Sequence, residues 1–180
     1  MATLQTLPDL LGPDLDLVFV GINPGERSAE LGHYYAHPGN GFWPALSASP
    51  LLAAPAGPED DRSLAVTARI GFTDVVKRVI TDSTEVSNDE LRASESAFRS
   101  RIAATAPRAV CLTSSRAFDV LFPKVRSSGA WGRQPVAFEG ASIWVMPSTS
   151  GRAVRHREHV HRVLAELATF LGRTQIRGVA

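Results

Sequence analysis

The chain has 180 residues, which is enough for one domain with a substantial core, and hydrophobic residues make up 44% of it. This composition is typical of a globular protein and excludes a disordered chain. Because the formal net charge is only +1, the chain has no overall basic field, and a nucleic acid would have to be bound by a local basic patch.

The start of the chain predicts one buried strand. Residues 1–14 hold scattered leucines with two prolines and a glycine, and they predict a short lead-in helix or turn. Residues 17–20 form an apolar run rich in β-branched and aromatic side chains, which predicts a buried strand. The strand must end before Pro24, because proline cannot donate a hydrogen bond to a sheet ladder.

The next part of the chain predicts short helices and loops. Residues 42–52 predict a short helix broken by Pro50, and residues 53–61 predict a mobile loop rich in Pro, Ala and Gly. Residues 62–69 predict another modest helix. We interpret residues 71–74 as the end of this connection, followed by a short apolar piece.

A long helix follows a clear capping signal. Ser87 is the predicted N-cap, and Glu90 stands three residues later, as in a capping box. The helix is expected to run to about residue 106, where Pro107 ends it.

The last third of the chain alternates strands with helices. Residues 109–113 predict a buried strand, and residues 114–121 predict a helix. Residues 136–138 and 143–146 predict two further strands joined by a turn. Apolar side chains at helical spacing predict a last helix over about 155–171.

Strands that alternate with helices indicate the fold class. We expect an α/β fold, a three-layer α/β/α sandwich with a mainly parallel central sheet. Residues 1–180 are predicted to form a single domain, in which residues 173–180 form a flexible tail.

Two segments near the start of the chain look like parts of a ligand site. The turn Gly21-Ile22-Asn23-Pro24-Gly25 follows the first predicted strand, and ligands of α/β folds bind where such strands end. Its glycines would let the backbone approach a ligand closely, with Asn23 between them. The alternative is an ordinary turn with Asn chosen for its conformation. Residues 32–43 then hold many rings in a loop framed by Gly and Pro, which suits stacking on a planar ligand.

The first of these segments, followed by His37-Pro38-Gly39-Asn40-Gly41-Phe42-Trp43, resembles the mismatch-specific uracil and thymine DNA glycosylases of the uracil-DNA glycosylase superfamily. Residues 71–74, 128–132 and 146–152 carry further motifs in the order found in that family. The resemblance extends from the first strand to the last helix. It implies hydrolysis of the N-glycosidic bond of a base that has been flipped out of the duplex.

The resemblance assigns the chemistry to two residues. Asn23 matches the catalytic asparagine, whose amide can orient a water but cannot act as a strong base. Asp74 departs from the Asn or Lys of the relatives, and a carboxylate can take a proton from water and stabilise a cationic sugar. The alternative for Asp74 is the N-cap of a following helix.

Three further residues are expected to form the base pocket. Tyr35 matches the ring that stacks on the flipped base; its alternative is a core aromatic with its hydroxyl in water. The backbone N–H groups near Ile22 and Tyr35 would stabilise the departing base anion, and Ser28 would shape the pocket. For His33 and His37, packing or phosphate contact is favoured over metal binding.

A second segment is expected to contact DNA. It follows a strand, carries small hydroxylated residues that suit close approach to the backbone, and is followed by basic residues. Arg152 matches the residue that fills the gap left by the flipped nucleotide, although a solvated helix face is the alternative for the basic residues. The predicted DNA-contacting residues are Pro147, Ser148, Thr149, Ser150, Gly151, Arg152 and Arg155.

We therefore expect a monofunctional glycosylase that removes uracil, with G:U mismatches in double-stranded DNA as its substrate and thymine or other damaged pyrimidines as further candidates. Strand-cleaving lyase chemistry is not expected, since no Lys stands in the pocket motifs to form a Schiff base. A glycosylase for another damaged base, such as hypoxanthine, and a non-catalytic DNA-binding module remain alternatives. A nucleotide-binding enzyme is disfavoured, because no G-x-x-x-x-G-K-[ST] motif occurs.

The expectations about cofactors and about the cellular compartment rest on features that the sequence lacks. Cys111 is the only cysteine, which excludes a disulfide framework and an iron–sulfur cluster held by several thiolates. No cofactor or metal is expected. No membrane span or signal peptide is apparent, so we expect a cytoplasmic, bacterial-type monomer without a membrane partner.

Overall fold

The computed structural model describes residues 5–127 and 130–173, apart from the side chains of residues 152–154. Its five strands are β1 (Leu17–Gly21), β2 (Ile70–Asp74), β3 (Ala109–Leu112), β4 (Gly132–Phe138) and β5 (Ala141–Val145). Its α-helices are α1 (Glu26–Leu31), α2 (Phe42–Ser47), α3 (Leu64–Thr67), α4 (Asn88–Thr105), α5 (Ser115–Leu121) and α6 (Arg157–Phe170). Short 3-10 helices are η1 (Pro58–Asp60), η2 (Ser83–Glu85) and η3 (Gly151–His156).

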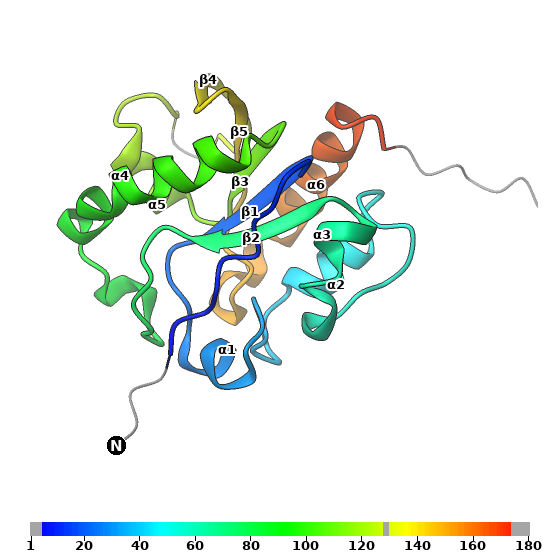
Figure 1. Ribbon diagram of the computed structural model, residues 1–180, viewed down its shortest axis with the longest axis horizontal. Helices are drawn as coiled ribbons and strands as arrows, with labels where there is room; N and C mark the ends of the chain where they lie inside the picture. Colours follow the sequence, from blue (N-terminus) through cyan, green and yellow to red (C-terminus); the bar gives the residue numbers. More distant parts are fainter. Residues whose placement is uncertain (1–4, 128–129, 174–180) are drawn as a thin grey trace, which may run out of the picture.

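The strands form one sheet in the order β2-β1-β3-β5-β4 (Figure 1). β1 pairs in parallel with β2 and β3, β3 pairs in parallel with β5, and only the edge strand β4 is antiparallel to its neighbour. The predicted mainly parallel sheet is therefore confirmed. The hairpin of β4 and β5 is also as predicted.

The sheet separates two hydrophobic cores. Alternate residues of β1 point to opposite faces, so that Leu17 and Phe19 join one core while Val18 and Val20 join the other. The first core includes side chains of α2, α3 and α6, and the second includes those of α4 and α5. Helices therefore cover both faces, and the predicted three-layer sandwich is confirmed (Figure 1).

The predicted cap of the long helix is confirmed. The Ser87 hydroxyl accepts a hydrogen bond from the Glu90 N–H at 3.0 Å, and Ala106, with a left-handed φ of 47°, is the C-cap that follows α4. The predicted helices over 114–121 and 155–171 correspond to α5 and α6. Within residues 5–127 and 130–173, no helix combines the length and apolar character needed to cross a bilayer.

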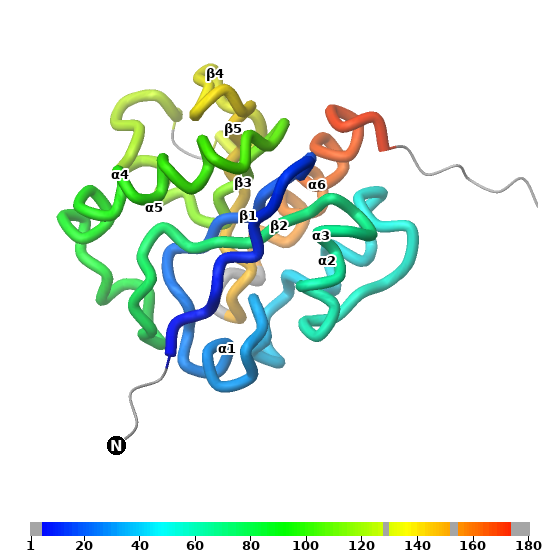
Figure 2. The backbone as a smooth tube through the Cα atoms, in the orientation of Figure 1, coloured from blue at the N-terminus to red at the C-terminus, as the bar shows by residue number. Residues whose placement is uncertain are grey.

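Several predictions about the first half were wrong. Residues 5–12 form no helix; they cross β2, where Leu10 and Phe72 exchange two backbone hydrogen bonds of 2.9 and 3.0 Å (Figure 2). The alternative of a turn before the first strand is confirmed at residues 13–14. Residues 71–74, interpreted as the end of a connection, belong to the buried strand β2. The helix α1 was not predicted, and α2 is shorter than the predicted 42–52. The predicted tail lies outside the described residues, except for Arg173.

The topology creates one natural site for a ligand. The connection from β1 leads to β2 on one side, whereas β3 lies on the other side of β1. The strand order thus reverses at β1, and ligands of open α/β sheets bind outside the carboxyl ends of the strands at such a point. Asn23 follows β1, and Asp74 ends β2, so both lie at this edge.

Candidate active site

A cavity of about 730 Å³ opens at the carboxyl edge of the sheet. It is bounded by the turn after β1, the loop after α1, the end of β2, and the segments that follow β3 and β5. Nine of the predicted site residues line it: Ile22, Asn23, Ser28, Tyr35, Asp74, Ser148, Thr149, Ser150 and Gly151. The cavity therefore brings together the predicted base pocket and part of the predicted DNA-contacting segment.

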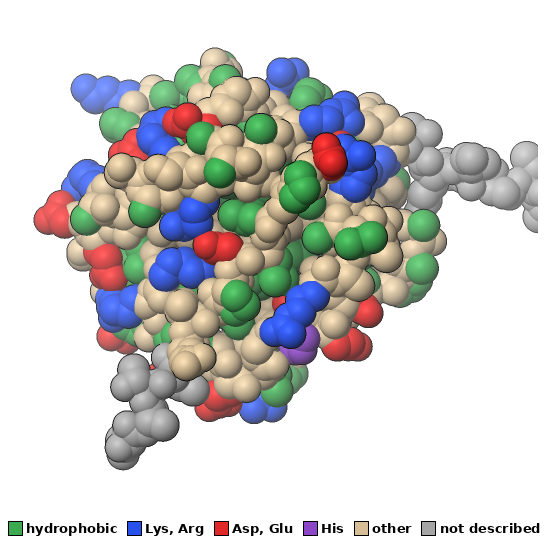
Figure 3. All heavy atoms as spheres, in the orientation of Figure 1, with side chains coloured by type: hydrophobic (Ala, Val, Ile, Leu, Met, Phe, Trp, Pro, Cys, Tyr) green, Lys and Arg blue, Asp and Glu red, His purple; other side chains and the backbone are tan. Residues whose placement is uncertain are grey.

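Two other predicted DNA-contacting residues, Pro147 and Arg155, are not among the lining residues. Pro147 is buried next to the lining. Arg155 is exposed on η3, where its Nε lies 3.1 Å from the His156 Nε2. The side chain of Arg152 lies outside the described residues, as do Ser128 and Gly129 of the motif at 128–132. Basic and acidic side chains are interspersed on the face in Figure 3, which fits the small net charge.

The Asn23 amide is held in one orientation. Its Nδ2 donates to the backbone oxygens of Pro24 at 3.0 Å and Ile80 at 2.7 Å. Its Oδ1 is buried and accepts no hydrogen bond from any described residue. Since buried polar atoms normally have a partner, Oδ1 is an acceptor ready for a water or ligand.

The Asp74 carboxylate is buried beside the turn after β1. Asp74 pairs with Gly21 across the parallel ladder and is 3% exposed. A Cβ added to Gly21 would collide with the Asp74 Oδ1, so glycine is required there for this close approach. Oδ2 is buried and has no hydrogen-bond partner among the described residues. The alternative of a helix cap was wrong, because residues 75–80 are irregular.

The electrostatic setting places the titration of Asp74 in the neutral range. Burial raises the pKa of this carboxyl to about 7, against the lowering effects of Lys77 and Arg101 and with a further raising effect from Asp9. Burial, and then the Asp74 charge, also raise the pKa of Tyr34 and Tyr35 above the ordinary range. Both phenols therefore stay protonated while Asp74 exchanges a proton.

Tyr35 presents an aromatic ring to the cavity from a strained backbone position. Its φ is 53°, in the left-handed region that bulky residues rarely adopt, at a cost of about 1 kcal/mol or more. One ring face stacks on Phe42, with centroids 4.0 Å apart and an interplanar angle of 18°. The hydroxyl lies 3.1 Å from the Thr113 Oγ1, so it is bonded within the protein and not only to water.

Buried polar contacts fix the loop that carries Tyr35. The Ser28 Oγ accepts from the Ala36 N–H at 3.1 Å. The Asp61 carboxylate binds His33 Nδ1 at 3.0 Å and accepts from the Tyr34 N–H at 2.9 Å. In this structure His33 therefore has a structural role within the protein, through its contact with Asp61. No group of three or more His, Cys, Asp or Glu suited to a metal was found among the described residues.

Sequence reasoning missed several parts of the lining, among them Thr113 and residues 80–84. Thr113 stands at the carboxyl end of a predicted strand, so the argument that selected Asn23 also applied to it. Residues 80–84 also line the cavity, and Arg116 secures this segment by donating to the Ser83 oxygen at 3.0 Å. Nothing in the local sequence of 80–84 signals that it reaches Asn23.

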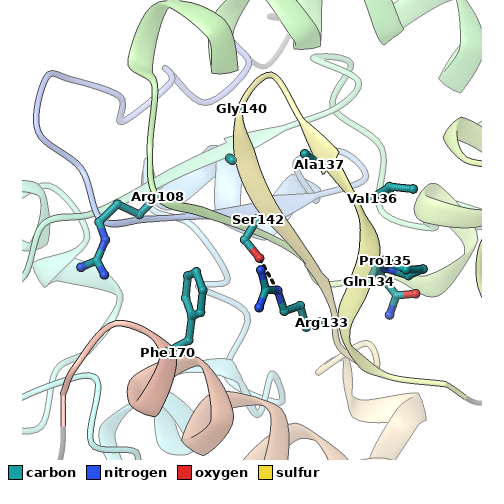
Figure 4. A pocket seen from close by; sticks show the side chains of 10 residues that line it. Arg108, Arg133, Gln134, Pro135, Val136, Ala137, Gly140, Ser142 and Phe170 are labelled. Atoms are coloured by element: carbon teal, nitrogen blue, oxygen red, sulfur yellow. Dashed lines mark hydrogen bonds between the residues drawn. The ribbon is translucent and has the colours of Figure 1, made fainter.

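A second hollow, of about 630 Å³, lies along the hairpin β4–β5 (Figure 4). Arg108 and Ser142 on its wall stand at the amino ends of β3 and β5, so this hollow is at the opposite edge of the sheet. Arg133 donates to the Ser142 Oγ at 3.0 Å and lies 5.0 Å above the Phe170 ring. None of the predicted site residues whose side chains the structure describes lines it.

Comparison with known proteins identifies the fold and the family of the chain. The solution NMR structure of a candidate uracil DNA glycosylase from Methanosarcina acetivorans is similar to the chain, with a TM-score of 0.58 at 18% sequence identity. The match covers 92% of this chain and 99% of that one. At this identity the likeness shows a shared fold. The sequence model of the uracil DNA glycosylase superfamily matches residues 8–168. Because this match covers most of the chain, the protein belongs to the uracil DNA glycosylase superfamily, whose members act on DNA.

Proposed function

We propose that the protein is a monofunctional DNA glycosylase that hydrolyses the N-glycosidic bond of uracil, with G:U mismatches as its preferred substrate. One observation carries this proposal: the side chains of Asn23 and Asp74 line one cavity, and each keeps a buried oxygen without a hydrogen-bond partner among the described residues. Such oxygens are costly unless a ligand or water completes them.

The water that attacks the sugar would be held by both residues. The Asn23 Oδ1 accepts a hydrogen bond from it and fixes its direction, which is positioning catalysis. The Asp74 carboxylate takes the second proton as the bond to the sugar forms, and its charge stabilises the cationic sugar. A carboxyl with a pKa of about 7 suits this task, since a general base works best when its pKa lies near the operating pH.

The base would be bound between the aromatic loop and the turn after β1. The uracil ring must leave the base stack before the enzyme can reach it. The energy cost of unstacking and unpairing the base is offset by stacking and hydrogen bonds in the pocket. Phe42 covers one face of Tyr35, so we propose that the base packs on the remaining face. The N–H groups of Ile22 and Tyr35 would bind its carbonyl oxygens and stabilise the leaving anion.

The DNA backbone would run over the segment at residues 147–152. The segment after β5 lines the same cavity with Ser148, Thr149 and Ser150, which supports contact with phosphates flanking the flipped nucleotide. We propose that Arg152 enters the gap in the duplex and that Arg155 contacts phosphate. Such a local contact agrees with a net charge of only +1.

A panel of duplexes with one lesion each tests the function. After incubation with the protein, heating in alkali cleaves the strand wherever a base has been removed. We expect cleavage at uracil opposite guanine, in the presence of EDTA, and an intact strand before the alkali step. Release of hypoxanthine but not uracil would support the other glycosylase branch. Binding of duplexes without release of any base would support the non-catalytic module, and restoration of activity by a divalent ion after EDTA treatment would contradict the mechanism.

A further inference from the structure

The Asp9 carboxylate binds groups from three parts of the chain. Its Oδ1 accepts hydrogen bonds from the Thr73 hydroxyl at 2.6 Å and the Lys77 ammonium at 2.8 Å. Its Oδ2 lies 3.4 Å from the Arg101 Nε. Asp9 belongs to the extended N-terminal segment that crosses β2, and Arg101 belongs to α4 (Figure 2). This carboxylate is therefore shared by two cations.

The groups that bind Asp9 also surround Asp74. Arg101 donates from Nη2 to the backbone oxygen of Asp74 at 2.7 Å, and Thr73 precedes Asp74 in β2. Lys77 lies three residues beyond it, and its ammonium is also 3.4 Å from the Tyr34 hydroxyl. Yet the Asp74 Oδ2 has no hydrogen-bond partner among the described residues. Two cations thus stand near the unpaired carboxylate, and the ion pairs that both of them form are with Asp9.

We propose that Asp9 is a positioning residue, which holds Lys77 and Arg101 in its own ion pairs and so keeps them from pairing with the carboxylate of Asp74. This inference rests on the proposed function, in which Asp74 is the base. A cation paired directly with Asp74 would occupy its free oxygen and weaken it as a proton acceptor. With Asp9 in place, the charges of Lys77, Arg101, Asp9 and ionised Asp74 sum to zero.

The charges facing Asp74 give opposite expectations for two substitutions. The groups that act on it are Lys77, Asp9 and Arg101, while the Tyr34 and Tyr35 phenols on the adjacent loop remain neutral. Asp9→Asn removes the anion and leaves two cations, so Asp74 should ionise more easily. Lys77→Met removes one cation and leaves the anion, so Asp74 should ionise less easily. A merely structural role for Asp9 would not produce this reversal of sign.

The test is a ¹³C NMR titration of the side-chain carboxyls, in which Asp74→Asn identifies the Asp74 signal. In the otherwise unchanged chain we expect its midpoint near pH 7. In Asp9→Asn the midpoint should fall by about one pH unit, and in Lys77→Met it should rise by a similar amount. Thr73→Val is the matched control, since it removes the hydrogen bond to Asp9 but no charge. Its midpoint should stay in place.

An unchanged midpoint in Asp9→Asn, or shifts of the same sign in both charge variants, would overturn the inference. Asn keeps the size of Asp and an acceptor for Thr73, and Lys77→Met probes the same cluster from its other side if Asp9→Asn does not fold. The titration needs no activity, so its result can be read whether or not the protein releases uracil. If the midpoints move as expected while the pH dependence of uracil release does not follow them, the proposed role of Asp74 fails and the placement of the charges by Asp9 stands.

Discussion

Two aspartates at opposite ends of the sheet have opposite surroundings. Asp16 precedes β1 at the amino edge, where its carboxylate lies 3.3 Å from Arg69 Nε, 3.6 Å from Arg108 Nη1 and 3.0 Å from Arg173 Nη2. Asp74 ends β2 at the carboxyl edge, and its Oδ2 has no hydrogen-bond partner among the described residues. Both residues are largely buried: the side chain of Asp16 is 13% exposed, and Asp74 as a whole residue is 3% exposed.

The difference in surroundings indicates different roles: the Asp16 carboxylate stabilises the fold, whereas the Asp74 carboxylate is left free for chemistry. Around Asp16, three guanidinium groups surround the carboxylate, and Arg173 also donates to the backbone oxygens of Leu51 and Ala68. The charge of Asp16 therefore joins segments that are distant in the sequence. The charge of Asp74 is instead costly in the fold, as its raised pKa shows. A group left in this state is typical of active sites, where stability is given up for reactivity.

The largest effect is expected when the two aspartates are each replaced by Asn. Asp74→Asn should slow single-turnover release of uracil by about 10²–10⁴-fold, or roughly 2.7–5.4 kcal/mol of barrier, because an amide cannot take the proton. Asp16→Asn, the matched control at the other edge, should release uracil at the unmodified rate. Equal rates for Asp74→Asn and the unmodified protein would remove Asp74 from the chemistry.

The next effect concerns the space that Gly21 leaves for Asp74. Gly21→Ala should cost on the order of 10²-fold in the same rate, because its Cβ must displace the Asp74 carboxylate from its place beside the turn. Gly12→Ala is the control, since a Cβ there meets no atom within 4 Å. An active Gly21→Ala protein would show that the position of the carboxylate is not critical.

Stability should respond to the two Asn substitutions with opposite signs. The folded pKa of Asp74, about 7, lies above its ordinary value of 3.8, so this group's contribution to stability is lost as the pH rises between these values. From pH 5 to pH 8, the free energy of unfolding of Asp74→Asn should therefore rise relative to that of the unmodified protein by on the order of 2 kcal/mol. Urea unfolding at the two pH values measures this gain, and a constant difference would contradict the costly charge.

The smallest effect is the loss of stability at the other edge. Asp16→Asn should lower the free energy of unfolding by about 1–2 kcal/mol, because it leaves three guanidinium groups without their shared anion. The half-exposed side chains of Arg69 and Arg108 keep this value modest, since water screens them. Urea unfolding at pH 8 measures it, and a stability equal to that of the unmodified protein would mean that Asp16 is not a structural anchor.

Local patterns were sufficient to predict much of the fold. The apolar run at 17–20, the capping box at Ser87 and the spacing of the last helix each correspond to an observed element, and their alternation predicted the layers. The strand β2 was missed because its sequence, Ile70-Gly71-Phe72-Thr73-Asp74, holds a glycine and ends in a carboxylate. The strand is covered by β1 on one side and by the N-terminal segment at Leu10 on the other, and both are distant from it in the sequence.

The site was predictable in its members but not in its geometry. Asn23 and Asp74 could be selected by motif, but their meeting at one edge of the sheet could not be predicted, because the strand β2 that ends in Asp74 was missed. The Ile80 oxygen that fixes the Asn23 amide lies 57 residues away in the sequence, and Asp9 lies 64 residues from Thr73. Such contacts follow from the folded chain as a whole. Gly21 was expected to admit a ligand, whereas its missing Cβ leaves room for Asp74.

The pH dependence of uracil release under single-turnover conditions tests most directly the claim that Asp74 is the proton acceptor. Between pH 5 and 9, the rate should rise with pH to a plateau, with a midpoint near 7 where the carboxyl ionises. Asp74→Asn should lose this rising limb as well as the rate. A rate that does not change with pH, or a limb that persists in Asp74→Asn, would contradict the claim and leave the chemistry to Asn23.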